Sequence, residues 1–157
     1  TSIHLIQRGV IRLLQMFPHD GVRTPDVHEF NQQMQFEMDN IRDFIILHYK
    51  QTQRDDSEFW NFYRTMEIPD TLAHRIEMFR ENGYVWPDQA NLFRSHSWIQ
   101  VMFGQGLFPK HTHGATRILP AESLKVELAK VATSVNQNVA KLPGHEEFIK
   151  QYCPAHG

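Results

Sequence analysis

Histidine and carboxylate residues at metal-ligand spacing are the first candidates for chemistry in this sequence. The segment HEEFI begins like the zinc-binding helix of a metalloprotease, but Ile149 stands where a second histidine would follow His145 by one helical turn. His111 and His113 could present two imidazoles from a loop, yet a metal site needs a further acid or thiolate nearby. No glutamate is followed three residues later by histidine, the spacing that di-iron bundles use. The sequence therefore predicts no metal cofactor.

A pair of glycines and the charge balance bear on nucleotide and nucleic-acid chemistry. Gly104-Gln105-Gly106 is followed by Leu-Phe-Pro, so the third glycine of a dinucleotide-binding turn is missing, and no strand pattern precedes it. The formal net charge is −2 with the 10 histidines neutral, which lacks the basic excess that binding to a phosphate backbone requires. We expect neither a flavin-binding turn in this chain nor a nucleic-acid partner.

Cysteine usage and hydropathy bear on the compartment. Cys153 is the single cysteine, which excludes an intramolecular disulfide and a thiolate zinc cage and suits a reducing environment. The longest apolar stretches, FIILHY and WIQVMFG, are far shorter than the roughly 20 residues that cross a bilayer, and no signal-peptide pattern opens the chain. We expect a cytoplasmic protein without a membrane span.

Length and periodicity predict the fold that positions these residues. With 157 residues, of which 41% are hydrophobic, the chain is long enough for one globular domain with an apolar core. Apolar residues recur at three- and four-residue spacing, and no segment shows sustained strand alternation. The predicted fold class is all-α, a multi-helix region whose long loops at 84–94 and 105–119 need something outside this chain to pack on.

Turn and cap residues predict where the helices begin and end. Thr24 is expected as the N-cap of a long central helix that ends at Lys50. Either Asp56 or Ser57 caps a short aromatic helix, and Asp70 caps the next, which Gly83 ends in a left-handed conformation. The other helices are expected at 2–17, from Ser95 to Gly104, after Pro120 and after Gly144.

Three of these helices carry an apolar face, and we expect the face of the central helix to be buried. On the first helix the face consists of Ile3, Ile6, Val10, Leu13 and Leu14. On the central helix it consists of Val27, Phe30, Met34, Ile41, Phe44, Ile45 and His48, although apolar residues are frequent enough in FEMDNIRDFIIL for two faces to be covered. On the last long helix it consists of Leu124, Leu128, Val131, Val135 and Val139.

Several longer stretches carry a resemblance to a known family. They are TSIHLIQRGVIRLL at the start, IRDFIILHYKQTQRDDSEFW and RTMEIPDTLAHRIEMF in the middle, SWIQVMFGQG later and LPGHEEFIKQYC near the end. In order and spacing these blocks resemble the C-terminal part of flavin-dependent tryptophan halogenases, over nearly the whole chain. The resemblance implies that residues 1–157 form the helical substrate-binding region of such an enzyme.

The family's chemistry is the first thing that the resemblance implies. In the family, reduced FAD reacts with oxygen, chloride or bromide attacks the hydroperoxide, and hypohalous acid travels through a tunnel to a lysine beside the substrate. The substrate, tryptophan or another indole, is then halogenated by electrophilic substitution. The flavin site and the catalytic lysine and glutamate belong to an N-terminal half that this chain lacks, and a separate flavin reductase supplies the reduced flavin. We therefore expect the chain alone to be inactive.

The resemblance also implies a set of substrate-binding residues. Phe59 and Trp60 match a Phe-Trp pair that sandwiches the indole, and Tyr49 matches a tyrosine of the same region. Asp55 falls where a glutamate grips the substrate ammonium, and His48 falls where a second tyrosine would sit. Stacking on Trp or Phe and a charge-assisted bond to an ammonium suit these roles. The two departures leave free tryptophan and other indoles open, and Phe59 and Trp60 could instead belong to the core.

At the start of the chain the resemblance implies a halide site. Thr1 and Ser2 match the residues that follow the family's catalytic glutamate, where backbone amides at a helix N-terminus help to hold the halide. The resemblance leaves a homodimer open. Composition and periodicity alone fit a second class of function equally well, a non-enzymatic helical binding or interaction module.

Overall fold

The computed structural model describes residues 2–86, 92–112 and 114–154. Within these residues the regular structure is helical and no strand occurs, as the all-α prediction requires. The helices are α1 (Ser2–Gln15), α2 (Thr24–Lys50), α3 (Glu58–Thr65), α4 (Asp70–Asn82), α5 (Ser95–Gly104), the 3-10 helix η1 (Gly114–Ile118), α6 (Ala121–Val139) and α7 (His145–Tyr152). Contacts divide the chain into two compact units, residues 1–113 (unit 1) and residues 114–157 (unit 2).

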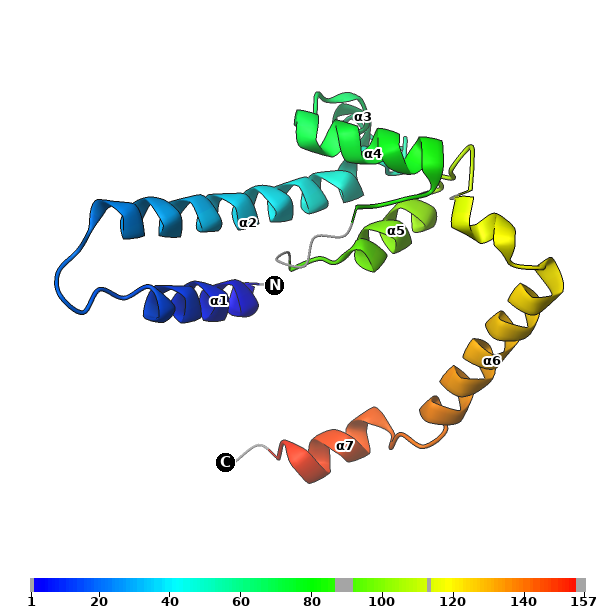
Figure 1. The fold of residues 1–157 in the computed structure, drawn as a ribbon. Coiled ribbons are helices and arrows are strands. Elements are labelled where there is room, and N and C mark those ends of the chain that lie inside the picture. Colours follow the sequence, from blue (N-terminus) through cyan, green and yellow to red (C-terminus); the bar gives the residue numbers. More distant parts are fainter. Residues whose placement is uncertain (1, 87–91, 113, 155–157) are drawn as a thin grey trace. The chain divides into compact units, whose positions relative to one another are not determined.

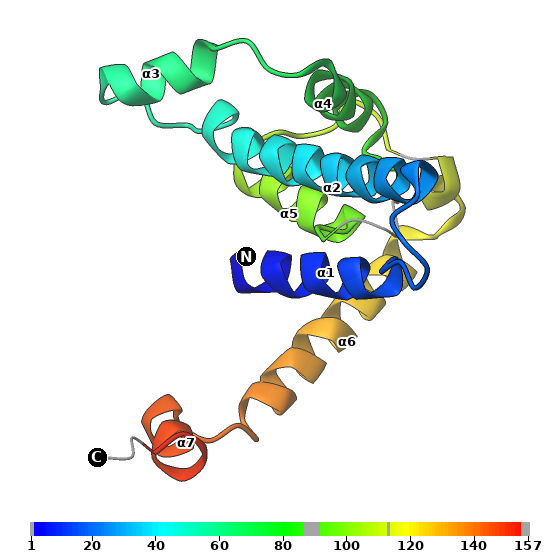
Figure 2. The same cartoon turned by 90° about the vertical axis from the view of Figure 1, so that its left-hand side faces the viewer.

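The long helix α2 is the centre of unit 1, as predicted. Helices α3 and α4 pack on one side of its C-terminal half and α5 packs on the other (Figure 1 and Figure 2). Arg23 precedes the helix in an extended conformation, and Pro25 lies in the first turn, where its missing N–H costs no helical hydrogen bond. The prediction of Thr24 as the cap is wrong by one residue, because Thr24 is already helical.

The apolar core of unit 1 lies where α2, α4 and α5 meet. Trp98 of α5 is 2% exposed, and its Nε1–H donates to the carbonyl oxygen of Phe93 at 3.1 Å, which satisfies the polar atom of a buried ring. The Arg75 guanidinium lies over the same ring, 4.0 Å from its centroid. The buried apolar side chains are Ile41, Phe44, Leu47, Leu72, Ile76, Phe79, Val85, Trp98 and Met102.

The buried face of α2 differs in part from the predicted one. Ile41 and Phe44 are buried as expected, whereas Val27, Ile45 and His48 are exposed, Ile45 to 50%. Leu47, which the prediction leaves out, is fully enclosed. The reason is that α4 and α5 cover different sides of the helix (Figure 1), which agrees with the alternative that two faces of α2 are covered.

Two buried carboxylates join α2 to its neighbours. Glu37 is 3% exposed and pairs with Arg8 and Arg12 of α1, the second at 2.8 Å. Asp43 is 4% exposed and accepts a hydrogen bond from the Thr71 hydroxyl of α4 at 2.5 Å. A buried carboxylate is tolerated only where such partners replace water. These two contacts therefore fix α1 and α4 against the central helix.

The apolar face predicted for α1 is present but is not covered. Helix α1 has no buried residue, and its five stripe positions are between 47% and 75% exposed. They are Ile3, Ile6, Val10, Leu13 and Leu14. The predicted apolar stripe is thus present, and the described residues leave it exposed.

The ends of α3 and α4 test the cap predictions. Ser57 is the N-cap of α3 and accepts a hydrogen bond from the backbone N–H of Trp60, as predicted. Pro69 occupies the cap position of α4, so Asp70 is its first helical residue and not its cap. Gly83 ends α4 with φ of 65°, the left-handed conformation that glycine adopts without strain.

Unit 2 consists of η1, α6 and α7. Helix α6 follows Pro120 and α7 follows Gly144, close to the predicted starts. None of the described residues of unit 2 is buried, and the stripe from Leu124 to Val139 is between 49% and 60% exposed. Its ion pairs are local, Glu122 with Lys125 and Glu127 with Lys130. The apolar core that length and composition predict therefore lies in unit 1.

Candidate functional site

The candidate site is built where α2 ends and α3 begins. Lys50, the last residue of α2, donates a hydrogen bond from Nζ to the carbonyl oxygen of Met66 at 2.6 Å, which holds the end of α2 against the end of α3. Seven residues connect the two helices, and the Ser57 cap sets where α3 starts. Tyr49 in the last turn of α2 thereby faces Trp60 in the first turn of α3, with stacked rings 6.0 Å apart.

A cavity of about 560 Å³ opens beside this ring pair. Its size falls in the range of small-molecule sites, and aromatic rings form much of its wall. Phe44 and Phe93 stack at 3.9 Å between centroids, which adds a second aromatic pair to Tyr49 and Trp60. The lining residues are Phe44, Ile45, His48, Tyr49, Thr52, Trp60, Phe93 and Gln105.

His48 stands at the border of the cavity with one ring nitrogen engaged. Its Nδ1 lies 2.7 Å from the carbonyl oxygen of Phe44, one turn earlier in α2. Its ring meets the Phe44 ring edge-on, with centroids 4.8 Å apart. These two contacts hold the imidazole in one orientation at the cavity wall.

The end of α5 supplies the polar side of the cavity. The Gln105 side-chain amide donates to the carbonyl oxygen of His48 at 3.5 Å, and the Gln105 carbonyl accepts from the Gln53 side chain at 2.6 Å. Gly106 follows with φ of 80°, and a Cβ there would lie 3.2 Å from the Gln53 side chain. The positive φ of this turn after α5 is a conformation that glycine adopts without strain.

Phe59 and Asp55 lie near the cavity but do not line it. Phe59 meets Trp60 and Tyr63 edge-on, with centroids 5.0 and 4.8 Å apart, and is itself 52% exposed. The side chain of Asp55 is exposed, and its backbone carbonyl accepts a hydrogen bond from Asn61 at 3.2 Å. The structure thus brings His48, Tyr49 and Trp60 together at one cavity, and the substrate contacts of all five residues stay predictions.

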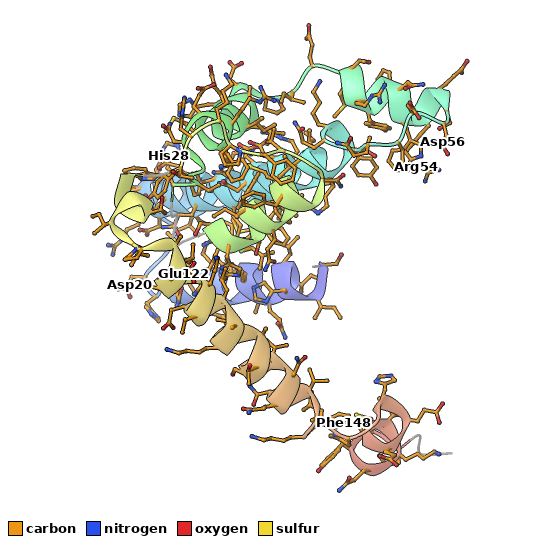
Figure 3. The ribbon with its side chains drawn as sticks, turned by 90° about the vertical axis from the view of Figure 1, so that its right-hand side faces the viewer. Asp20, His28, Arg54, Asp56, Glu122 and Phe148 are labelled. Atoms are coloured by element: carbon orange, nitrogen blue, oxygen red, sulfur yellow. The ribbon has the colours of Figure 1, made fainter. Side chains whose placement is uncertain are left out.

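An ion pair covers part of Trp60. The Arg54 guanidinium lies 4.8 Å from the centroid of the Trp60 ring and pairs with Asp56 at 2.7 Å (Figure 3). The hydrogen bond from Arg54 lowers the pKa of Asp56 below its ordinary value, and the same bond raises the pKa of Arg54. Because both groups are fully exposed, solvent screens the pair.

The other predicted sites lie elsewhere in the chain. Ser2 begins α1, whose first backbone amides have no helical acceptor, and Thr1 lies outside the described residues. The halide role of both stays a prediction. Among the described residues no group of three or more His, Cys, Asp or Glu could hold a metal ion, and no helix there could span a membrane.

The glycine pair at 104–106 does not fit a flavin. Gly104 ends α5 and Gln105 is the C-cap of that helix, so the helix presents its carbonyl end to this turn. A pyrophosphate requires free N–H groups and the positive end of a helix dipole. The described residues therefore offer no dinucleotide-binding turn at this place.

Five cavity residues were not among the predicted site residues: Phe44 and Ile45, which were assigned to the apolar face of the central helix, and Thr52, Phe93 and Gln105. Thr52 and Gln105 are polar residues without a recognisable motif, and Phe93 lies before α5 in an irregular segment. Phe93 is 49 residues from Phe44 in sequence, so only the packing of α5 on α2 brings them together. No local pattern could have identified Thr52, Phe93 or Gln105.

Comparisons with known proteins agree with this architecture. The family model for tryptophan halogenase matches residues 1–121. Among solved structures the chain is similar to Xcc4156, a flavin-dependent halogenase from Xanthomonas campestris, with 46% identity and a TM-score of 0.91 over 99% of this chain and 31% of that one. It is also similar to BrvH, a flavin-dependent halogenase from Brevundimonas sp. BAL3, with 36% identity and a TM-score of 0.86 over 96% of this chain and 31% of that one.

A curated relative extends the comparison. The 7-chloro-L-tryptophan 6-halogenase KtzR of Kutzneria sp. (strain 744) is 25% identical over 155 residues, which is 95% of this chain and 30% of that protein. The chain thus spans about 30% of the length of the relatives that it matches. It belongs to the tryptophan halogenase family, and the resemblance read from its sequence is confirmed.

Proposed function

We propose that residues 1–157 form the substrate-binding region of an FAD-dependent halogenase that chlorinates or brominates tryptophan or another indole. The observation that carries the proposal is the cavity of about 560 Å³ with His48, Tyr49 and Trp60 in its wall. A flat, electron-rich ring gains stacking energy on such aromatic walls in addition to the burial of its apolar surface. The chain's part in the reaction is to bind and orient the ring that is halogenated.

The absence of charged side chains in the described cavity lining favours an indole substrate without charged groups. None of the described residues that line the cavity carries a carboxylate, an ammonium or a guanidinium. Asp56 is paired with Arg54, and Asp55 lies outside the lining. A free amino acid would bring an ammonium and a carboxylate that need partners when they lose water. An uncharged indole needs none, whereas the ammonium of tryptophan would need a partner such as Asp55, which lies outside the lining.

The flavin is assigned to a part of the enzyme outside residues 1–157, whereas the halide role stays with the backbone amides at Thr1 and Ser2. Reduced FAD, oxygen and chloride or bromide together supply the electrophilic halogen when the flavin is bound. The turn at 104–106 does not suit a pyrophosphate, so the flavin would be held outside this chain and reduced by a separate reductase. The uncovered apolar face of α1 is consistent with contact to such a part, and the chain alone would bind indole without converting it.

Binding to the 157-residue chain tests the site directly. Indole binding, measured by calorimetry, should weaken in Trp60→Ala by about 2 kcal/mol, roughly thirtyfold, the scale of one lost stacking platform. Trp86→Ala is the matched control, because Trp86 is 76% exposed and does not line this cavity. Unchanged affinity in Trp60→Ala would refute the site.

A chimeric enzyme separates this proposal from the alternative of a non-enzymatic helical interaction module, which the exposed stripes of α1 and α6 also fit. The chain replaces the matching 31% of the Xanthomonas campestris halogenase, and the chimera is supplied with FAD, a flavin reductase, bromide and indole. The proposal expects a brominated indole by mass spectrometry, and its loss in Trp60→Ala. A folded, flavin-binding chimera that forms no brominated product would favour the interaction module.

A further inference from the structure

We infer that His48 selects and orients the substrate by accepting a hydrogen bond from the indole ring N–H at its Nε2 atom. The inference rests on the proposed function and names the substrate group that this residue recognises. The indole N–H is a donor only, so a site that encloses it must offer an acceptor. Among the side-chain ring nitrogens, hydroxyls and amides around the cavity, His48 Nε2 is the acceptor whose position and orientation best suit this hydrogen bond.

The tautomer of His48 follows from its contact with its own helix. Nδ1 lies 2.7 Å from the carbonyl oxygen of Phe44, and a carbonyl oxygen can only accept a hydrogen bond. Nδ1 therefore carries the proton, and in the neutral ring Nε2 carries a lone pair. Because Nδ1 is turned toward the backbone of α2, Nε2 lies on the edge of the ring that points away from that backbone.

The surroundings of His48 leave Nε2 available and hold the ring still. No described residue makes a hydrogen bond or ion pair with Nε2, whereas the His48 carbonyl accepts from Gln105. The edge-on contact with Phe44 restricts rotation of the imidazole. Phe44 also stacks on Phe93, so the acceptor stands beside one of the two aromatic walls. A ring that lies on such a wall can place its N–H at the cavity border.

The other polar groups of the cavity are less suited to the role. The Thr52 hydroxyl oxygen accepts from the backbone N–H of Arg54 at 3.3 Å, and Thr52 is buried. The Gln105 side chain donates to the His48 carbonyl, which orients its amide along the wall. Tyr49 stacks on Trp60, and its hydroxyl can rotate to donate or accept. The Gln105 amide oxygen is also oriented by a hydrogen bond, but that bond is 3.5 Å long, whereas His48 is held by a bond of 2.7 Å and by the edge-on contact with Phe44.

The experiment compares two ligands of the same size on the 157-residue chain. Indole and benzofuran differ at one ring position, which is N–H in indole and oxygen in benzofuran. Their affinities are measured by ligand-observed NMR titration. One net hydrogen bond corresponds to a preference for indole of about fivefold. That preference should disappear in His48→Phe, which keeps a flat ring but has no acceptor, while the affinity for benzofuran changes little.

Two further variants distinguish a hydrogen bond between His48 and the indole N–H from a general contribution of the side chain to the shape of the cavity. His48→Gln places an amide oxygen near the position of Nε2 and should keep a preference of about twofold or more. Gln105→Met removes a polar lining group and should change both affinities by the same factor, so that their ratio is kept. In ¹⁵N spectra of the unmodified chain, His48 should show the Nδ1–H tautomer, and added indole should shift its Nε2 resonance.

Each outcome supports or overturns the inference. A preference for indole that is lost only at His48, together with the Nδ1–H tautomer, supports it. If both ligands bind but their ratio is unaffected in His48→Phe, or if His48→Phe weakens both equally, the inference falls and the indole site stands. If neither ligand binds the unmodified chain at millimolar concentration, the proposed function falls and the inference falls with it.

Discussion

Unit 1 contains every buried side chain of the described residues, whereas the described part of unit 2 contains none. Both units carry amphipathic helices, and α6 of unit 2 has a longer regular apolar stripe than α4 or α5 of unit 1. In unit 1 the apolar residues of α2, α4 and α5 cover one another, and buried carboxylates add contacts between helices. In unit 2 the ion pairs connect residues three apart on the same helix.

The difference shows that an apolar stripe predicts that a helix face will pack against another apolar surface, but it does not predict which surface that is. Isolated helices are marginal in water, and a local ion pair adds only about 0.2–0.5 kcal/mol. Burial of apolar side chains stabilises a helix far more, and within the described residues such burial occurs only in unit 1. The candidate site lies in unit 1 for the same reason, because a cavity with fixed walls requires helices that hold each other in place.

The largest expected difference between the units is in hydrogen exchange. Amides at 41–47 of α2 should exchange only through global unfolding, with opening free energies on the order of 5 kcal/mol, whereas amides at 128–135 of α6 should open at close to zero cost. Mass spectrometry of deuterium uptake on the 157-residue chain measures both segments in one sample. Equal protection of the two segments would contradict the comparison.

A matched pair of leucine substitutions tests the same contrast in the free energy of unfolding. Leu47 is fully enclosed in unit 1 and Leu128 is 60% exposed in unit 2. Leu47→Ala should lower the free energy of unfolding by about 4 kcal/mol, because it removes apolar contacts and leaves a cavity. Leu128→Ala should change it by less than about 0.5 kcal/mol. Urea titrations followed by circular dichroism give both values, and similar losses would show that α6 is covered in solution.

A matched pair of glutamate substitutions tests the two kinds of ion pair. Glu37→Gln removes the carboxylate shared by Arg8 and Arg12 in a buried setting and should cost about 3 kcal/mol of unfolding free energy. Glu122→Gln removes one partner of an exposed pair on α6 and should cost less than about 0.5 kcal/mol. Thermal and urea unfolding measure the two losses. A small effect at Glu37 would mean that α1 is held by other contacts.

The smallest effect concerns an exposed pair that joins distant parts of unit 1. A hydrogen bond from Lys110 is the main reason that the pKa of Glu81 lies below its ordinary value of 4.5. The pair therefore adds stability above pH 4.5 that is lost as the pH falls through the lowered pKa. Lys110→Met should raise the pKa of Glu81 toward the ordinary value in an NMR titration. The pKa of Asp56, which Arg54 lowers, is the control that should not move.

Much of the fold could be predicted from the sequence because helix formation is largely local. The cap at Ser57, the left-handed end at Gly83 and the start of α5 at Ser95 depend on residues within a few positions of each other. The family could be recognised for a related reason, because its blocks keep their order along the chain. The errors at Thr24 and Asp70 are shifts of one residue at helix ends, where neighbouring positions compete for the cap.

For the candidate site the sequence by itself determined a family resemblance that predicted His48, Tyr49 and Trp60, and only the tertiary structure decided that Phe93 and Gln105 line the same cavity. The tertiary structure also decided that Ile45 is half exposed at the cavity wall, that Phe59 contacts Trp60 edge-on without lining the cavity, and that the apolar stripes of α1 and α6 are left uncovered in the described residues. The physical reason is the range of the interactions. Helical periodicity and capping act over three or four residues, whereas the contacts that bury a face or close a cavity join residues some 50 positions apart, and no local pattern encodes them.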